Sequence, residues 1–339
     1  MNKSKSFFIK TFGCQMNEAD SEKIGGWYES RGWKKAKSIN EADEIIINTC
    51  SVRQSAEHRV MGLINNIKSQ NAKVKDKRPR IILTGCMLYH GMTTLKQKLP
   101  DVDQFVGVKD LIHNSEFLIL NSKAPAFIPI MEGCNNFCTY CVVPYARGRE
   151  KSRHLDEIIC EVKELVKRGT RKIMILGQNV NSFQPSFAEL LINLNKISGL
   201  EKISFMTSNP WDLTDEIINA MKLPKVDRYL HLPVQSGDDE ILRKMNRHYT
   251  AKQYLQLVKK IRNEIPEIKI GTDIIVGFPG ETEEQFNNTV RLCKKVGFIK
   301  AYIARYSPRP VTTAYKLKDN VSPQEKKRRW QILENLINS

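Results

Sequence analysis

Residues 131–150 of this chain read MEGCNNFCTYCVVPYARGRE, a loop with three cysteines within eight residues and a basic run directly after them. Cys134, Cys138 and Cys141 follow a C-x3-C-x2-C pattern. Structural zinc sites usually present four ligands, and no fourth Cys or His lies nearby in a matching motif. A four-iron cluster held by only three thiolates leaves one iron open to a substrate or cofactor. The odd number of thiols therefore favours an iron–sulfur cluster.

From residue 126 onward, through this loop and beyond it, the sequence alternates between predicted strands and predicted helices. The candidate strands are AFIPIMEG, RKIMILGQN, EKISFMTSN, DRYLHLPVQ, IKIGTDIIVGF and FIKAYIARY. Strands that alternate with helices predict a parallel sheet with right-handed crossovers. Six such units are too few for a full eight-stranded barrel of roughly 250 residues. We therefore expect an open, partial (β/α)6 barrel over residues 129–310, with its site at the carboxyl ends of the strands.

The first hundred residues contain a second set of cysteines. Three predicted strands, SFFIKTFGC, DEIIINTC and RIILTGC, alternate with helices, and each ends in a cysteine. These are Cys14, Cys50 and Cys86, separated by 36 residues each (50 − 14 and 86 − 50). The loops after parallel strands share one edge of an open sheet, which is where ligands bind. We expect the three thiols to converge there, and three buried structural cysteines are the alternative.

Composition indicates a globular protein that acts on a polyanion. Of 339 residues 41% are hydrophobic, and no apolar run approaches the roughly 18 residues that a membrane span needs. The start, MNKSKSFFIKTFGC, lacks the apolar core of a signal peptide, so we expect a cytoplasmic protein in which the eight cysteines stay reduced. Lys and Arg outnumber Asp and Glu by 54 to 37, a net charge of +17. Such an excess favours nucleic acid as a partner, although an AT-rich genome, which encodes Lys-rich proteins, would also produce it.

The predicted organisation is α/β throughout. Residues 1–120 are expected to form a flavodoxin-like parallel-sheet domain, with a helix over 17–32 that Asn17 caps. A linker with Pro and small residues follows at 121–128, before the barrel at 129–310. The segment 311–339 is predicted to be helical, because its apolar residues recur at helical spacing; these are Trp330, Leu333, Leu336 and Ile337.

The cysteine loop in this context resembles the radical S-adenosylmethionine (SAM) superfamily. Further segments narrow the resemblance to the methylthiotransferases: KTFGCQMNEADSEK, NTCSVRQSAEHR, TGCM, GCNNFCTYCVVPYARGREKSR, LGQNVNSF, HLPVQSG, DIIVGFPGETEEQF and YSPRP. LGQNVNSF, TSNP and RGREKSR most resemble the MiaB type. The resemblance covers essentially the whole chain. It implies a three-cysteine domain followed by a radical SAM barrel.

The resemblance also implies cofactors and ligands. Cys134, Cys138 and Cys141 would hold the [4Fe-4S] cluster that cleaves SAM into a 5′-deoxyadenosyl radical, with no catalytic residue beyond the cluster ligands. Cys14, Cys50 and Cys86 would hold a second [4Fe-4S] cluster, where the transferred sulfur binds. One SAM would supply the methyl group and another the radical. Tyr140, the aromatic before the third cysteine of the loop, would pack near the cofactor.

Other polar residues near the expected strand ends are candidates for binding. Gln178, Asn179, Gln235 and Ser236 could bind SAM, or they could cap helices. Gly277, together with Gly280, could admit adenine or simply form a turn. The basic residues Arg147, Arg149, Lys151 and Arg153 could grip tRNA phosphates or the cofactor carboxylate, or form a solvated charge run. Cys160 and Cys293 are predicted to be core residues.

The leading function is methylthiolation at C2 of N6-isopentenyladenosine, next to the anticodon at tRNA position 37. Methylthiolation of threonylcarbamoyladenosine in tRNA is the alternative, and that of an aspartate in a ribosomal protein is disfavoured. A non-catalytic iron–sulfur RNA-binding protein is the hypothesis from a different class. We expect tRNA as partner, flavodoxin or ferredoxin as electron donor, no membrane and a monomer. These enzymes normally continue into a TRAM domain, and we expect none within this sequence.

Overall fold

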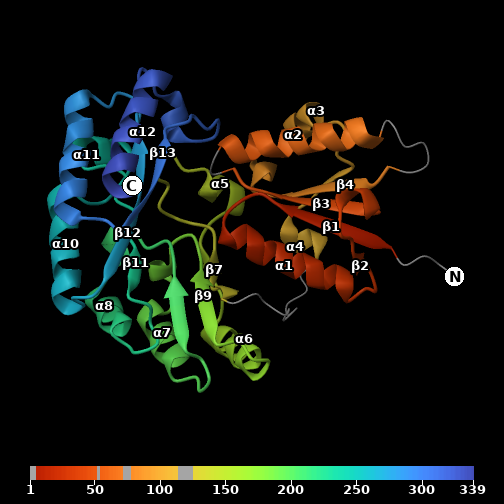
Figure 1. Cartoon of the computed structure of the whole chain (residues 1–339), viewed down its shortest axis with the longest axis horizontal. Helices are drawn as coiled ribbons and strands as arrows, with labels where there is room; N and C mark the ends of the chain where they lie inside the picture. Colours follow the sequence, from red (N-terminus) through yellow and green to blue (C-terminus); the bar gives the residue numbers. More distant parts are fainter. Residues whose placement is uncertain (1–4, 52–53, 72–77, 114–124) are drawn as a thin grey trace. The chain divides into compact units, whose positions relative to one another are not determined.

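The computed structural model of the chain describes residues 5–51, 54–71, 78–113 and 125–339 (Figure 1). The chain divides into two compact units. The first takes the described residues of Met1–Lys123 together with Tyr145–Gly148, and the second takes those of Ala124–Pro144 together with Arg149–Ser339. The expected boundary at residue 120 and residues 121–124 of the expected linker lie outside the described residues. Residues 126–128, also expected in the linker, belong to a strand.

The first unit is built on a five-stranded parallel sheet. Its strands are β1 Ser6–Thr11, β2 Lys34–Lys35, β3 Glu44–Thr49, β4 Arg80–Gly85 and β5 Gln104–Phe105. Their order, β2-β1-β3-β4-β5, is that of a flavodoxin-like sheet, which confirms the predicted fold class. The two edge strands were not predicted, because two residues are too few to show a pattern.

Helices cover both faces of this sheet. They are α1 Gln15–Glu29, α2 Gln54–Asn71, α3 Met92–Lys98 and α4 Val108–Leu111, with the 3-10 helices η1 Ile39–Glu41 and η2 Cys86–His90. Successive side chains of a strand point to opposite faces. Ile45 and Ile47 of β3 therefore pack with Val60 of α2, and Ile46 packs with Ile24 of α1. Figure 1 shows the same division, with α2 and α3 on one face and α1 and α4 on the other.

Helix α1 begins earlier than predicted. Cys14 is its N-cap residue, and Asn17 lies inside the helix with its side chain fully buried. The predicted cap at Asn17 is therefore wrong. Its amide donates to Asn48 Oδ1 and to the carbonyl oxygen of Thr49, both at 3.0 Å. The sequence signal of an N-cap and that of a buried tertiary donor are alike, because both use a short polar side chain.

The second unit contains six parallel strands in two three-stranded sheets. These are β6 Ala126–Pro129, β9 Lys172–Leu176 and β10 Lys202–Phe205 in one sheet, and β11 Tyr229–His231, β12 Lys269–Val276 and β13 Lys300–Arg305 in the other. An isolated parallel bridge joins Ile203 of β10 to Val226, three residues before β11, and β10 and β11 are in contact. The strand sequence β6-β9-β10-β11-β12-β13 confirms the predicted partial six-stranded barrel. A short antiparallel pair, β7 Met131–Glu132 and β8 Lys151–Ser152, flanks the cysteine loop.

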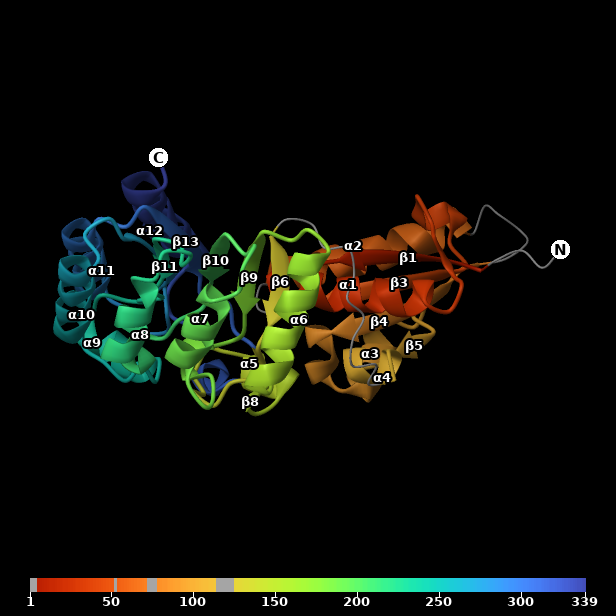
Figure 2. The same ribbon diagram turned by 90° about the horizontal axis from the view of Figure 1, so that it is seen from below.

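Helices follow the strands of this unit. They are α5 Val143–Arg147, whose last three residues belong to the first unit, α6 Leu155–Lys167, α7 Phe187–Asn195, α8 Asp215–Met221, α9 Asp239–Lys244, α10 Ala251–Glu264, α11 Glu283–Val296 and α12 Pro323–Ile337. The 3-10 helices are η3 Val180–Ser182, η4 Pro210–Asp212 and η5 Thr313–Lys316. Helices α6, α7, α8, α10, α11 and α12 pack each against the next, an arrangement that Figure 2 also shows.

The last helix, α12, closes the unit against β13. Ser322 caps it and Pro323 begins it, a favoured pairing at a helix start. Leu333 is fully buried and Trp330 donates its indole N–H to the carbonyl oxygen of Ile303. Leu336, predicted on the apolar stripe, is 38% exposed. Among the helices of the described residues, none has the length and apolarity to span a bilayer.

Candidate functional site

The cysteine loop lies beyond the carboxyl end of β6. Cys134 is buried, and Cys138 and Cys141 are half-buried. The backbone N–H of Cys141 donates to the carbonyl oxygen of Cys138 at 2.9 Å, and Phe137 adopts a φ of 46°. Burial raises the pKa of Cys134 and raises that of Cys141 to about 12. Both are neutral thiols at neutral pH, so a bound metal has to displace their protons.

The segment 244–247, at the end of α9, holds this loop in place. Thr139 donates its backbone N–H and its hydroxyl to the carbonyl oxygens of residues 245 and 244, at 3.1 and 2.8 Å. The Asn246 amide donates to the carbonyl oxygens of residues 136 and 137, at 3.0 and 3.2 Å. Arg247 Nη1 lies 3.5 Å from the sulfur of Cys138. Four successive residues therefore contact a loop that is more than a hundred positions away in the sequence.

A network of amides connects this segment to the ends of β9 and β10. Asn209 Oδ1 accepts from Arg247 Nη1 at 3.1 Å, and the Asn209 N–H donates to Asn179 Oδ1 at 3.1 Å. Asn179 Nδ2 donates to Asp212 at 2.6 Å. Beside them, Gln178 Oε1 is buried without a hydrogen-bond partner among the described residues. A buried acceptor without a partner is costly, so a ligand that donates to Gln178 would stabilise the site.

The remaining predicted cofactor residues differ in their surroundings. Gln235 is 7% exposed and has a φ of 64°, a strained value for a residue other than glycine. Ser236 is fully buried beside the hydroxyl of Thr289 and accepts from the N–H of Asp238 at 3.2 Å, so it shapes the turn before α9. Tyr140 packs against an apolar cluster that contains Met245 and Phe278, among others. Gln178 thus offers an unpartnered acceptor at the end of its strand, whereas Ser236 has a structural task.

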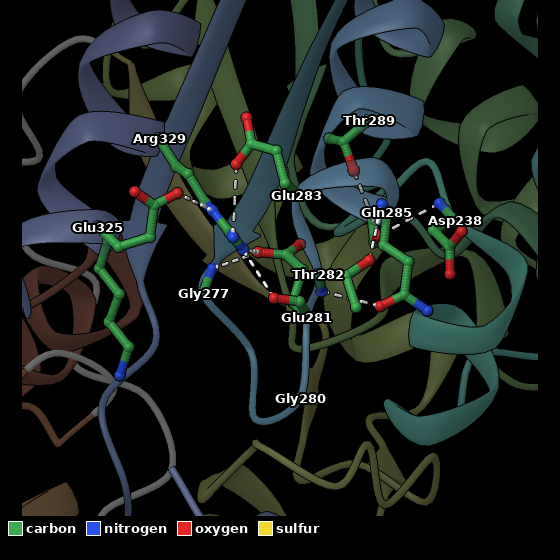
Figure 3. Close-up of polar contacts among 12 residues, drawn as sticks. Asp238, Gly277, Gly280, Glu281, Thr282, Glu283, Gln285, Thr289, Glu325 and Arg329 are labelled. Atoms are coloured by element: carbon green, nitrogen blue, oxygen red, sulfur yellow. Dashed lines mark hydrogen bonds and ion pairs between the residues drawn. The ribbon is translucent and has the colours of Figure 1, made fainter. Parts of the chain in front are cut away.

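Gly277 stands next to a buried ion pair (Figure 3). Its N–H donates to Glu281 Oε2 at 2.6 Å, and the same oxygen lies 2.8 Å from Arg329 Nη1 of α12. The side chains of Glu281 and Arg329 are 1% and 5% exposed. A Cβ on Gly277 would lie 2.3 Å from Cγ of Lys326, at a φ of 68° that favours glycine. The close approach that requires a glycine here is that of Lys326.

The basic run after the cysteine loop does not act as one surface. Arg153 pairs with Glu161 at 2.7 Å and donates to the carbonyl oxygen of residue 129 at 2.8 Å, so it braces β6 against α6. Arg149 lies 4.4 Å from the ring centre of Phe137, and Lys151 is exposed in β8. Arg147 lies in the first unit and pairs with Asp20 at 2.8 Å, with both side chains nearly buried.

The first unit brings its cysteines to one sheet edge. β1, β3 and β4 are neighbours in the sheet, and Cys14, Cys50 and Cys86 follow their carboxyl ends. Cys14 is exposed, and the other two are buried. Burial raises the pKa of Cys86, which the nearby Arg147 guanidinium opposes.

Buried polar groups fix the three loops to each other. Asn17 donates across to β3, as described, and Asn48 Nδ2 donates back to the carbonyl oxygen of Asn17 at 2.8 Å. Thr49 Oγ1 donates to the carbonyl oxygen of Thr84 at 2.6 Å. At Gly85, with a φ of 89°, a Cβ would lie 2.5 Å from Asn48 Oδ1. The loops that carry the thiols are thus connected by buried hydrogen bonds, although Ser51 Oγ and Thr84 Oγ1 beside them are buried without a partner among the described residues.

Both cysteine sets consist of thiols, the donor type that iron–sulfur clusters use. All six cysteines are free thiols. Among the described residues, no three His, Cys, Asp or Glu side chains converge closely enough to hold one metal ion. A cluster binds each thiolate to a different iron, so it needs thiols arranged around a volume instead of one point.

Three residues differ from or extend the sequence predictions. Cys160, predicted to be a core residue, is exposed on α6, so that prediction is wrong; Cys293 is buried as expected. The apolar stripe of α6 passes beside position 160, which periodicity alone does not resolve. Arg247 and Asn209 were not predicted as site residues. The TSNP segment could have indicated Asn209, which it contains, whereas nothing in the local sequence indicates that Arg247 is buried.

Comparisons with known proteins agree with this architecture. The Radical SAM superfamily matches residues 128–293, and the uncharacterized protein family UPF0004 matches residues 6–107. The structure of TsrM, a radical SAM methyltransferase from Kitasatospora setae, superposes with a TM-score of 0.68 at 13% identity, over 92% of this chain and 77% of that one. At that identity the likeness concerns the fold alone.

Closer relatives are found by sequence. A protein of Clostridium tetani is 45% identical over 99% of this chain and 82% of its own length, and one of Dehalococcoides mccartyi is 45% identical over 97% and 82%. Both carry the name tRNA-2-methylthio-N(6)-dimethylallyladenosine synthase. This identity extends over nearly the whole chain. The chain is therefore a member of the radical SAM family of tRNA-2-methylthio-N(6)-dimethylallyladenosine synthases.

Proposed function

We propose that this chain is a tRNA methylthiotransferase that acts at C2 of N6-isopentenyladenosine at tRNA position 37. The observation that carries the proposal is the pair of three-cysteine sets, each at the carboxyl edge of its own parallel sheet. The names of the relatives at 45% identity supply the substrate. The net charge of +17 supports a polyanionic partner such as tRNA.

The second unit provides the radical SAM site. Membership of the superfamily implies a [4Fe-4S] cluster and SAM, and Cys134, Cys138 and Cys141 are the thiols that would hold the cluster. When bound, this pair supplies a radical able to remove hydrogen from an aromatic C–H bond that acid–base chemistry leaves inert. The chain's own contribution is position. Gln178 offers an unpartnered acceptor to a donor on SAM, and Tyr140 fixes the loop on its apolar cluster.

The first unit provides the second cluster. Cys14, Cys50 and Cys86 would hold it with one iron open for the sulfur that is transferred. The buried amides of Asn17 and Asn48 keep these loops in place whether or not the cluster is bound, because their hydrogen bonds lie entirely within the chain. The ion pair of Arg147 with Asp20 lies at the same edge of the sheet, near Cys86.

The partners follow from this chemistry. Reduction of the radical cluster needs an external one-electron donor of low potential, for which a flavodoxin or a ferredoxin is suited. We propose that the chain works as a monomer in the cytoplasm, where tRNA and such donors are present. Of the basic residues after the cysteine loop, Lys151 and Arg149 are exposed and suit tRNA phosphates best.

Expression in a bacterial strain that lacks its own enzyme of this kind tests the function. The nucleosides of purified tRNA are measured by mass spectrometry. The expected result is the appearance of 2-methylthio-N6-isopentenyladenosine, which a Cys138→Ala chain does not restore. If isopentenyladenosine stays unmodified while 2-methylthio-threonylcarbamoyladenosine appears, the proposed substrate is wrong. If neither nucleoside changes and the reconstituted chain releases no 5′-deoxyadenosine, the enzyme class is wrong.

The iron content tests the two clusters. Anaerobic reconstitution is expected to give about eight irons per chain, as two four-iron clusters require. Replacement of Cys14, Cys50 and Cys86 by alanine should lower this to about four. A triple variant that keeps the full iron content would contradict the second site.

A further inference from the structure

Arg247 is a buried cation beside a predicted cluster ligand. The residue is 7% exposed, and its guanidinium lies between the rings of Trp211 and Tyr249, at 4.6 and 5.4 Å from their centres. Nη1 is 3.5 Å from the sulfur of Cys138. All of these residues belong to the second unit. The arginine is 109 positions away from Cys138 in the sequence, so the contact is a product of the fold.

The hydrogen bonds of Arg247 leave it little freedom. Nη2 donates to the carbonyl oxygen of Pro233 at 2.9 Å, Nε donates to the hydroxyl of Tyr249 at 3.3 Å, and Nη1 donates to both Asn209 and the sulfur. Four of the five N–H groups of the guanidinium are thus directed at atoms of the chain. Its position is fixed by these contacts, and Nη1 faces the thiol as a consequence.

Among the described residues, no carboxylate forms a direct ion pair with this arginine. Asp212 lies near enough to feel its charge, because burial raises the pKa of Asp212 and the charge of Arg247 opposes that rise. Across the described residues, Asp and Glu oxygens form ion pairs with many basic side chains, but none lies within 4 Å of Arg247. Its other partners in the chain are two neutral oxygens and a hydroxyl. A buried, unpaired charge is costly, and proteins almost always provide a counter-charge. Cys138 offers one as soon as it becomes a thiolate, which is what a cluster makes of it.

We propose that Arg247 donates a hydrogen bond to the Cys138 thiolate of the bound cluster and raises the reduction potential of that cluster. In this position it is a positioning and tuning residue, which acts on the cluster through the thiolate and touches no substrate. The proposal rests on the proposed function, because it takes Cys134, Cys138 and Cys141 as the cluster ligands.

The direction of the effect follows from electrostatics. Reduction adds one negative charge to the cluster, and a fixed positive charge at the sulfur stabilises the reduced form more than the oxidised form. Hydrogen bonds to cluster sulfurs act in the same direction and are among the recognised determinants of potential. Burial strengthens both effects, because little water screens the charge. A cluster without Arg247 is therefore harder to reduce.

The experiment uses the full-length chain with Cys14, Cys50 and Cys86 replaced by serine, so that the loop cysteines hold its only cluster. Into this background are placed Arg247→Gln, Arg247→Lys, Tyr249→Phe and Arg243→Gln. Arg243 is an exposed arginine of α9, four positions before Arg247, and serves as the matched control. Each chain is reconstituted anaerobically, its iron is counted, and the midpoint potential is measured by electron paramagnetic resonance during redox titration.

The expected result is a shift of the midpoint to more negative potential in Arg247→Gln and a smaller shift in Arg247→Lys, which keeps the charge. Arg243→Gln and Tyr249→Phe should match the parent, because both retain the cation at Cys138. An unshifted midpoint in Arg247→Gln at equal iron content overturns the proposal. So does a shift of equal size in Tyr249→Phe, which would mean that any loss of packing here suffices.

Loss of iron would give a separate outcome. If Arg247→Gln does not retain a cluster, the Arg247→Lys chain tests the proposal instead. An Arg247→Lys chain that retains four irons with an unshifted midpoint potential contradicts the hydrogen-bond part of the proposal. If the parent background binds no four-iron cluster at all, the proposed function fails instead. The two failures are therefore distinguishable.

Discussion

The ion pair between Glu281 and Arg329 gives a sharp test of how α12 supports the loop of Gly277. Glu281 accepts from the Gly277 N–H and from Arg329, and Arg329 also donates to the carbonyl oxygen of Glu281 at 3.0 Å and to Glu325 at 2.7 Å. Arg329→Met removes the cation and leaves a carboxylate that is 1% exposed with a single N–H donor. Removal of one partner of a buried pair typically costs about 3–5 kcal/mol. We expect a loss of unfolding free energy of that size.

The neighbouring Arg328 provides a matched control. It also pairs with Glu283 and Glu325, but its side chain is 47% exposed. Exposed ion pairs contribute about 0–1 kcal/mol, so Arg328→Met should cost no more than that. Both variants are compared with the parent by denaturant unfolding of the cluster-free, reduced chain, followed by tryptophan fluorescence. Equal losses in the two variants would refute the reasoning, because burial would then not set the strength of the pair.

The pH dependence gives the same test a second readout. Burial raises the pKa of Glu281, and the Gly277 N–H and Arg329 oppose that rise. Without Arg329 the pKa moves higher still. A carboxyl whose folded-state pKa lies above its unfolded value loses stability as pH rises through that interval. The cost of Arg329→Met should therefore be smaller near pH 5 than near pH 8, and a cost independent of pH would contradict a buried charge as its cause.

Three further predictions concern single residues. Asn17→Ala removes the donor that links α1 to Asn48 and Thr49 and leaves buried acceptors unpaired. We expect it to destabilise the chain by about 1–3 kcal/mol in denaturant unfolding. A loss no larger than that of Asn65→Ala, at an exposed position, would contradict the network's role. Gly277→Ala places a Cβ against Lys326 at a positive φ and should lower the melting temperature by several degrees, about 1–3 kcal/mol, whereas the open Gly62→Ala of α2 should not lower it. Burial raises the pKa of Cys293 to about 12, so this thiol carries almost no thiolate at pH 8. Iodoacetamide should therefore label the exposed Cys160 before Cys293, as peptide mass spectrometry would show. Early labelling of Cys293 would refute its burial.

Much of the fold could be predicted because its signals are local. The six barrel strands are β-rich segments followed by helix starts, and each predicted segment contains a strand of the structure. The edge strands β2 and β5, of two residues each, leave no pattern, and their pairing depends on neighbours far away in the chain. Asn17 shows the same limit, because a polar residue at a helix start reads as a cap until its tertiary partners are known.

The sequence by itself determined the six cysteines, their division into two sets of three, and the strand ends at which they lie, because spacing along the chain encodes a β–α repeat. Only the tertiary structure decided which polar side chains surround them. Arg247 meets Cys138, and Asn246 meets the carbonyl of Asn136, across 109 and 110 positions. Arg153, by contrast, is a candidate phosphate ligand in the sequence, but in the structure it forms an ion pair with Glu161. Hydrophobic periodicity reports only the nearest turns of chain, whereas desolvation and hydrogen bonding depend on which distant segments pack together.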